Sequence, residues 1–172
     1  HKIFAAVDCT GHGVPGAFMS MIGNEQLNHA IKDTTHPAEI LTQLNSGIKT
    51  ALKQDESSES RDGMDVALLS LEINREGNKN IINKLSFAGA NRPLYLIRNG
   101  QMQEFFPDKS PIGGSIREHK GYTNYDIEVQ PGDCFYIFTD GYADQFGGEH
   151  GKKLMTKKFK ELLLTIHSKP MT

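Results

Sequence analysis

The sequence predicts an α+β fold in which helices pack outside antiparallel sheets. Apolar residues follow helical spacing in the first third of the chain and again near its end, and they alternate with a period of two through the middle. Turn signals separate neighbouring strands in that middle part. A chain of 172 residues is long enough to bury one core, so we expect a single domain over residues 1–172.

The first third predicts one strand followed by two helices. An apolar run, Lys2–Asp8, ends on an acid and leads into a glycine-rich segment, residues 9–16. A helix is expected over Pro15–Asp33, because proline suits a first helical turn. Its apolar positions are Ala17, Met21, Leu27, Ala30 and Ile31. A second helix, Pro37–Gln54, carries a clearer stripe. That stripe is Ile40, Leu41, Leu44, Ile48 and Leu52.

The middle of the chain predicts a sheet of antiparallel strands. After an exposed loop over residues 55–62, Leu69, Leu71 and Ile73 alternate with Val66, Leu68 and Ser70. A turn at 75–78 leads into a strand over 81–88. The strands 93–98 and 101–106 flank Asn99-Gly100, a strong hairpin signal. A second hairpin is expected between 122–129 and 134–139.

The chain is expected to close with an amphipathic helix from about Lys152 to His167. Its predicted buried stripe is Met155, Phe159, Leu162, Leu163 and Ile166. The lysines between these positions fall on the solvated side of such a helix, so we do not interpret them as a binding patch.

Composition excludes several classes of function. The net charge of −2 provides no basic field for nucleic acid or for an anionic membrane surface, so we expect neither as a partner. Two cysteines, Cys9 and Cys134, are too few for a disulfide framework and favour a reducing compartment. The apolar runs are far shorter than the roughly 20 residues of a membrane helix. We therefore expect a cytoplasmic protein, although a larger parent chain could carry a membrane anchor.

Two aspartates are candidate metal ligands. Asp8 and Asp140 each follow an apolar strand and precede a glycine-bearing turn. A strand end fixes the backbone while the side chain points into a crevice, and carboxylates without nearby cysteine or paired histidine suit Mg²⁺ or Mn²⁺. The alternative for each residue alone is that its carboxylate caps a turn or the following helix.

The loop between the first strand and the first helix is a candidate phosphate site. Glycines at 11, 13 and 16 precede a helix start, where backbone amides attract anions. The loop lacks the Gly-Lys-Ser/Thr ending of a nucleotide P-loop. His12 is a candidate proton carrier by residue type, and a purely structural role in the tight loop is the alternative.

Taken together, these strings resemble the PPM protein phosphatases, in the branch of the stage II sporulation protein E (SpoIIE) phosphatase and related sigma-factor regulators. The first signature is the run Asp8 to Ala17, Asp-Cys-Thr-Gly-His-Gly-Val-Pro-Gly-Ala. Four further matches follow in order: Gly63 to Ala67, Ala88 to Leu94 (similar to Ala-Gly-His-Asn-Pro-Pro), Pro111 to Gly113, and Phe138 to Gly141. The resemblance extends from Ile3 to about Phe146.

The resemblance implies an αββα sandwich of two antiparallel sheets flanked by helices, with a metal centre in a cleft at one sheet edge. It implies that Asp8 bridges two Mn²⁺ or Mg²⁺ ions, that Cys9 contributes its backbone carbonyl, and that Asp140 binds the second ion. Gly11 and Gly13 would shape the adjoining phosphate loop. The implied reaction is hydrolysis of phosphoserine or phosphothreonine on a signalling protein by metal-activated water.

Departures from the family pattern bear on the metal site. The resemblance implies one or two strands and another aspartate before Asp8, and a closing strand with further acids after Thr172, so the chain would be truncated at both ends and the isolated piece weakly active or inactive. In the second signature, Asp144 would take the place of the family's acidic residue, or would only cap its loop. A third metal site in some members uses an acid near Asp62 or Asp65. Of the two, Asp65 is the better candidate, with a turn or strand-face role as the alternative.

The expected partner is a phosphorylated protein, for example an anti-sigma antagonist, and a sensor domain in the parent chain is expected to act through the two helices of the first third. A homodimer is compatible with this scheme. One competing hypothesis is a catalytically incomplete regulatory module that binds a phosphoprotein within a larger signalling protein. Another is a carboxylate–metal hydrolase that acts on a small phosphate ester.

Overall fold

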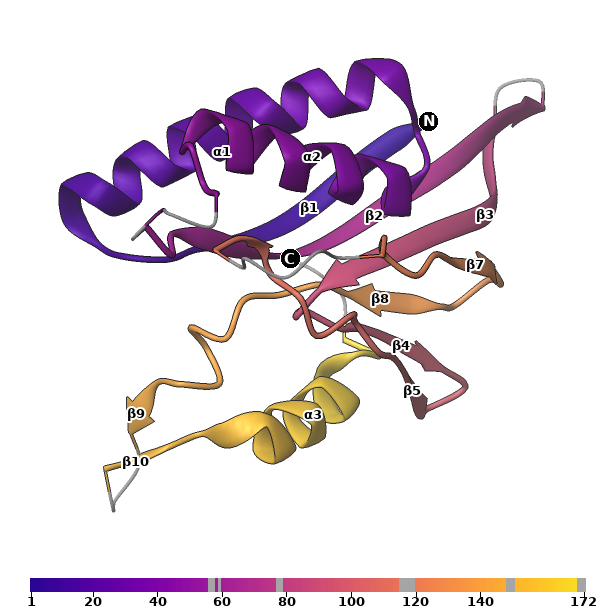
Figure 1. The fold of residues 1–172 in the computed structure, drawn as a ribbon. Coiled ribbons are helices and arrows are strands. Elements are labelled where there is room, and N and C mark those ends of the chain that lie inside the picture. Colours follow the sequence, from indigo (N-terminus) through magenta and orange to yellow (C-terminus); the bar gives the residue numbers. More distant parts are fainter. Residues whose placement is uncertain (56–57, 59, 77–78, 115–119, 148–150, 170–172) are drawn as a thin grey trace.

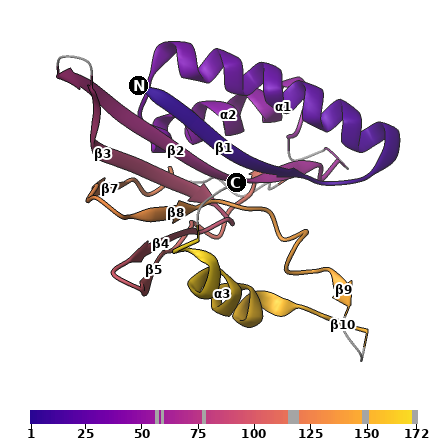
Figure 2. The ribbon, with the colours of Figure 1, turned by 180° about the vertical axis from the view of Figure 1, so that it is seen from behind.

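A computed structural model describes residues 1–55, 58, 60–76, 79–114, 120–147 and 151–169 of the chain. It has the predicted αββα layering: two helices, a first sheet, a second sheet and a third helix are stacked in that order (Figure 1). The view from behind shows the same order, with the C-terminal helix on the side opposite the first two helices (Figure 2). Within the described residues, no helix is long and apolar enough to cross a membrane.

The first sheet contains strands β1 (Lys2–Cys9), β2 (Gly63–Glu76), β3 (Lys79–Ala90) and β7 (Tyr125–Glu128), in the order β1-β2-β3-β7. A two-residue strand, β6 (Ile112–Gly113), pairs with the start of β2. All of these pairings are antiparallel, and a bulge interrupts the β2–β3 ladder between Glu72 and Ile73.

The second sheet has the order β5-β4-β8, with β4 (Leu94–Arg98), β5 (Gln101–Phe105) and β8 (Cys134–Tyr136). The β4–β5 hairpin turns at Asn99-Gly100 as predicted, and both residues have positive φ, 51° and 73°. Asparagine and glycine tolerate this left-handed region better than other residues, so the turn chemistry fixes the register of the hairpin.

The predicted hairpin between residues 122–129 and 134–139 is wrong. A tight turn is present, since the Asp133 N–H donates to the Gln130 carbonyl, but β7 pairs with β3 in the first sheet and β8 pairs with β4 in the second. Arg98 of β4 binds both Asp133 and the Glu128 carbonyl and so holds the crossing between sheets. A turn signal shows that the chain reverses, but it does not show which sheet edges the flanking strands pair with.

Helices α1 (Gly13–Asp33) and α2 (Pro37–Ala51) cover one face of the first sheet. Four residues of the predicted α2 stripe, Ile40, Leu41, Leu44 and Ile48, are buried. The helix ends at Ala51, three residues earlier than predicted, and the fifth residue, Leu52, lies just beyond it and is half-buried. The phase predicted for α1 is wrong near its start, where Met21 is 68% exposed and Ala17 is also exposed. Gly23 sets the actual buried face, since a Cβ there would lie only 2.6 Å from Met64 Cε of β2.

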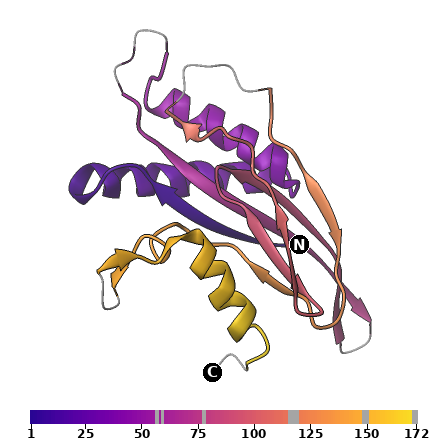
Figure 3. The ribbon, with the colours of Figure 1, turned by 90° about the horizontal axis from the view of Figure 1, so that it is seen from below.

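The last helix, α3 (Met155–Ile166), packs against the second sheet on the side away from the first sheet. The view from below shows it beside the β4–β5 hairpin (Figure 3). It begins three residues later than predicted, because Lys152–Lys153 forms strand β10 against β9 (Phe146–Gly147) and Met155 has a positive φ of 67°. Phe159 and Leu163 are buried as predicted, whereas Met155 and Ile166, at the two helix ends, are exposed.

Three apolar layers hold these elements together, and strand alternation assigns side chains to them. In β2, Val66 and Leu68 face the helices while Ala67 and Leu69 face the second sheet. In β4, Leu94 and Leu96 pack between the sheets, and Tyr95 and Ile97 pack against α3. Cys9 and Cys134 are both free thiols.

Candidate active site

Two acids face one another across the first sheet. Asp8, near the end of β1, is the direct register partner of Asp65 in β2. The Asp8 side chain is 35% exposed and the Asp65 side chain 27%. Like charges directly opposite on paired strands repel each other, so this arrangement needs a cation between or beside them. The sequence prediction placed Asp8 after its strand, whereas the structure places it within the ladder.

A third acid comes from the second-sheet side. Asp140 lies in the turn that follows β8, with three irregular residues between the strand and the aspartate, and its side chain is 52% exposed. The three carboxylates therefore come from two neighbouring strands of one sheet and from a loop that leaves the other.

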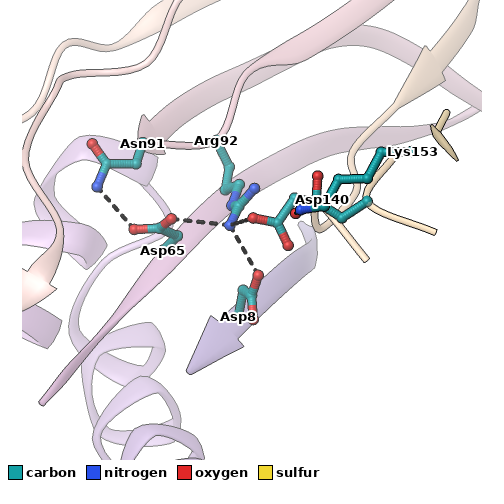
Figure 4. A network of polar contacts seen from close by, with 7 residues as sticks. Asp8, Asp65, Asn91, Arg92, Asp140 and Lys153 are labelled. Atoms are coloured by element: carbon teal, nitrogen blue, oxygen red, sulfur yellow. Dashed lines mark hydrogen bonds and ion pairs between the residues drawn. The ribbon is translucent and has the colours of Figure 1, made fainter. Parts of the chain in front are cut away.

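The cation at their centre is Arg92, from the connection between β3 and β4 (Figure 4). A single terminal nitrogen, Nη2, lies 2.9 Å from Asp8 Oδ2, 3.1 Å from Asp65 Oδ2 and 2.8 Å from Asp140 Oδ2. The Arg92 side chain is only 14% exposed. Three formal negative charges and one positive charge leave the cluster at −2, so it remains strongly attractive to further cations.

The segment that carries Arg92 is held tightly. Asn91 has a left-handed φ of 60°, and its Nδ2 donates to Asp65 Oδ1 at 2.8 Å. Its backbone N–H donates to the Asp108 carbonyl, and the Asp108 N–H donates to the Gly89 carbonyl. The backbone folds so closely here that a Cβ on Gly89 would lie 2.3 Å from the Arg92 carbonyl oxygen. Only glycine fits this position.

The electrostatics of the cluster differ from one carboxyl to the next. Burial raises the pKa of Asp8, with the charges of Asp140 and Asp65 acting in the same direction and that of Arg92 opposing them. The hydrogen bond from Arg92 is the main cause that lowers the pKa of Asp140. Burial disfavours the Arg92 charge, but the hydrogen bond to Asp140 and the three nearby carboxylates raise the pKa of the guanidinium overall.

A cavity of about 290 Å³ opens beside the cluster. Its walls include Asp8, Asp65 and Arg92 together with Cys9, Thr10 and Arg61. Two lining residues are joined by a pair of hydrogen bonds, since the Thr10 hydroxyl donates to the Gly63 carbonyl and accepts from the Gly63 N–H. The cavity thus joins acidic and basic groups in a space large enough for a phosphorylated side chain.

The other predicted site residues lie around this centre in different ways. Cys9 ends β1 opposite Met64 and lines the cavity. Gly11 and Gly13 both have positive φ, 85° and 64°, as a tight loop before a helix requires. His12 is exposed and immediately precedes α1 without capping it through its side chain. Asp144 lies outside the cluster and pairs with Lys153 Nζ at 2.7 Å.

Sequence reasoning assigned no role to Arg92. The signal was present, because the matching segment reads Ala-Gly-Ala-Asn-Arg-Pro where the resembled motif has Ala-Gly-His-Asn-Pro-Pro. Apolar packing does not account for a charged residue between asparagine and proline on a link between two apolar strands, so this arginine indicated a polar role.

Comparisons with known proteins agree with this fold and with the motifs. The sequence pattern of the family described as Stage II sporulation protein E (SpoIIE) matches residues 2–172. The chain belongs to the SpoIIE family. Among solved structures, this SpoIIE-family chain is similar to the SiaA-PP2C domain of Pseudomonas aeruginosa, with 32% identity and a TM-score of 0.74. That alignment covers 94% of this chain and 60% of the SiaA-PP2C chain.

More distant structures show the same fold. The PPM Ser-Thr phosphatase MsPP from Mycobacterium smegmatis, solved with cacodylate, has 14% identity and a TM-score of 0.61, over 98% of this chain and 75% of MsPP. The PP2C phosphatase domain of SpoIIE from Bacillus subtilis, solved with a fragment of its regulatory domain, has 16% identity and a TM-score of 0.62, over 99% of this chain and 44% of that one. No curated protein sequence matches the chain significantly. The fold is therefore that of a PP2C-type phosphatase domain.

Proposed function

We propose that this SpoIIE-family chain is the catalytic core of a metal-dependent serine/threonine protein phosphatase. The observation that carries the proposal is the convergence of Asp8, Asp65 and Asp140, from three separate elements, on one cation position. Three carboxylates without cysteine or histidine form an all-oxygen donor set, which suits Mg²⁺ or Mn²⁺. PPM phosphatases generally depend on these metals.

The donor set fits such an ion in charge and chemistry. Within the described residues no group of three His, Cys, Asp or Glu side chains is already spaced to hold a metal ion. The carboxylate oxygens lie 2.8–3.1 Å from the Arg92 nitrogen, whereas Mg²⁺–oxygen distances are about 2.0–2.1 Å. The carboxylates would therefore have to move inwards to bind an ion at that position.

In this proposal Asp8 and Asp140 hold the ions, the Cys9 carbonyl contributes from the end of β1, and Asp65 adds a further carboxylate. Bound divalent ions would supply a more acidic water and neutralise charge on phosphoryl oxygens. The strand ladder fixes Asp8 and Asp65 before substrate arrives, and this saves reorganisation during the reaction. Arg61, on the cavity wall, is placed to attract the phosphoryl group.

The substrate in this proposal is a phosphoserine or phosphothreonine protein, for example an anti-sigma antagonist, and the compartment is the cytoplasm. A sensor domain in the full-length protein and assembly into a homodimer belong to the same scheme. The chain spans 60% of the length of the SiaA-PP2C chain that it matches.

The test is manganese-dependent hydrolysis of a phosphoserine peptide by the full-length protein. Asp8→Asn and Asp140→Asn should each lower kcat by at least about 100-fold, since even changes in the groups that orient metal ligands commonly cost 10–100-fold. Asp126→Asn is the matched control, because this exposed acid pairs with Lys84 on β3 and takes no part in the cluster. Equal activity of Asp8→Asn and Asp126→Asn would refute the proposal.

A regulatory module without turnover is the second candidate. The observation that favours it is the guanidinium of Arg92 at the centre of the acids, since a permanent internal cation could replace the metals. Saturable binding of a phosphoserine peptide by the full-length protein, without hydrolysis at any Mn²⁺ or Mg²⁺ concentration, would select this function.

A further inference from the structure

We infer that Arg92 is a positioning residue that competes directly with divalent metal ions for the three carboxylates and thereby sets the metal affinity of the site. The inference rests on the proposed function, because it concerns the same acids, Asp8, Asp65 and Asp140. It concerns how they behave before metal binds and how tightly the metal is then held.

The guanidinium enters the acid cluster end-on. Arginine usually binds carboxylates through two parallel N–H groups of its planar fork. Here the contacts with all three carboxylates use the one nitrogen Nη2, while the Nε atom is buried with no hydrogen-bond partner within the described part of the chain. One nitrogen carries only two hydrogens, so its three acceptors are held by charge as well as by hydrogen bonds. Nη2 therefore acts as a point cation at the centre of the cluster.

A cation at this point stabilises the fold without metal. Asp8 and Asp65 are register partners on neighbouring strands, and Asp140 approaches from the side of the second sheet. Without a positive charge the three carboxylates would repel one another and would separate or take up protons. Arg92 keeps them together, and Asn91 fixes the other oxygen of Asp65, so the metal-free site remains close to the arrangement that a metal needs.

The same contacts exclude a metal ion. The oxygens that contact Nη2 are the Oδ2 atoms of all three acids, and an ion bound to them would have to take the place of that nitrogen. A divalent ion and a guanidinium at contact distance also repel strongly in a partly buried site. Metal binding therefore requires Arg92 to leave the cluster, and the free energy of its three contacts is subtracted from the observed binding free energy.

The competition can be measured as metal affinity, independently of turnover. Mn²⁺ binding to the full-length protein is titrated by electron paramagnetic resonance, in which free Mn²⁺ is counted directly. Arg92→Gln removes the charge and should lower the Kd for Mn²⁺ at least about tenfold, since the cluster then has one more net negative charge and no internal cation. Arg92→Lys keeps a positive charge on a long side chain and should stay within about threefold of the unaltered protein.

Lys84→Gln is the matched control, because it also removes one positive charge, but from an exposed pair with Asp126 that lies outside the cavity and the acid cluster. It should leave the Kd unchanged. In EDTA, Arg92→Gln should also melt at a lower temperature than the unaltered protein, and saturating Mn²⁺ should restore most of the loss. A merely structural role for Arg92 would weaken metal binding, which is the opposite sign.

A second measurement follows Arg92 by nuclear magnetic resonance in the unaltered protein, so its result does not depend on the stability of a variant. In the unaltered protein, titration with diamagnetic Mg²⁺ should shift the Arg92 Nε–H resonance, which Arg92→Lys identifies by its disappearance. An unchanged resonance at saturating Mg²⁺ would overturn the inference.

The two hypotheses fail in different ways. Equal or weaker Mn²⁺ affinity in Arg92→Gln, together with binding that Asp8→Asn abolishes, would overturn the competition and leave the proposed phosphatase intact. Absence of Asp8-dependent Mn²⁺ binding in both the unaltered protein and Arg92→Gln would overturn both. Binding that appears only in Arg92→Gln would support the competition and favour the regulatory module.

Discussion

Substituting alanine for Gly89 tests whether close backbone packing positions the segment that carries Arg92. Gly89 is buried in β3, three residues before the arginine. An added Cβ would lie 2.3 Å from the Arg92 carbonyl oxygen and 2.9 Å from both Phe87 Cζ and Pro107 Cβ. Contacts under 3.0 Å do not occur for real Cβ atoms, and a backbone oxygen and a proline ring cannot rotate away. The link between β3 and β4 would have to move.

The expected cost follows from these contacts. Overpacking a tight core costs roughly 1–3 kcal/mol, and the rigid neighbours place Gly89→Ala at the upper end. Alanine recovers only about 0.4–1 kcal/mol by restricting the unfolded chain. We therefore expect a net loss of about 2 kcal/mol in the free energy of unfolding. Because Arg92 moves with the link, the Mn²⁺ affinity of the site should change as well.

Urea denaturation of the full-length protein, followed by circular dichroism, measures the first effect. Gly147→Ala is the control, since Gly147 is exposed in β9 and a Cβ there would meet no atom of the described residues within 4 Å. It should change the free energy of unfolding by less than about 0.5 kcal/mol, as exposed substitutions usually do. If Gly89→Ala were as stable as Gly147→Ala, the argument that close packing positions Arg92 would be refuted.

Three further predictions concern the layers that support the site. Ile48→Ala empties a fully buried position between α2 and the first sheet and should cost about 2–5 kcal/mol in urea denaturation; a loss under 1 kcal/mol would contradict the core assignment. Phe159→Ala removes the ring that packs on Phe138 and should cost about 3–5 kcal/mol, and unchanged stability would show that α3 does not depend on this contact. Asp133→Asn should destabilise the protein at pH 7, since hydrogen bonding by Arg98 lowers the pKa of Asp133 in the folded state. The stabilisation by the Arg98–Asp133 pair is complete above the unfolded pKa of Asp133, near 4, and is lost as pH falls through the lower folded pKa. The difference in free energy of unfolding between Asp133→Asn and the unaltered protein should therefore narrow towards pH 3. A difference that stays constant with pH would count against the ion pair.

Hydrophobic periodicity correctly predicted the strands that bury every second side chain on one face and the helices that bury side chains at three-to-four-residue spacing. The alternation in β2 and the stripe of α2 are confirmed because each such element packs against a broad apolar surface. The α1 phase was mispredicted because small residues, not large ones, make its closest contact: Gly23 is buried against Met64 while Met21 is exposed. A hydrophobicity pattern gives weight to methionine and none to glycine.

Pairing between distant strands could not be read in the same way. The turn after β7 carries the usual hairpin signals, yet the chain crosses there from one sheet to the other. What decides the crossing is the free edge of β3 and of β4, together with the bond from Arg98 to Asp133, and these are properties of the assembled sheets.

In the candidate site, too, local sequence predicted some residues, and others became apparent only from the pairing of distant segments. Asp8 and Asp140 were recognisable from their position beside glycine turns, and Asp65 was weighed only as an outside candidate. The register of β1 on β2 is what brings Asp65 opposite Asp8. The departure from the motif marks Arg92 in the sequence, but its role was missed because the three acids that it contacts come from distant segments and meet only in the folded chain.

The position of Arg92 also connects the site to both sheets. Its link leaves β3 of the first sheet and enters β4 of the second, while the acids come from the first sheet and from the loop beyond β8 of the second. A small slide between the sheets would therefore move Arg92 and Asp140 relative to Asp8 and Asp65. Helix α1 also contacts the strand that carries Asp65, since Gly23 of α1 packs on Met64, the residue before Asp65. In the proposed scheme, a force on α1 that alters this contact would reach the strand that carries Asp65, so a sensor acting through α1 would change metal affinity before it changed the chemistry.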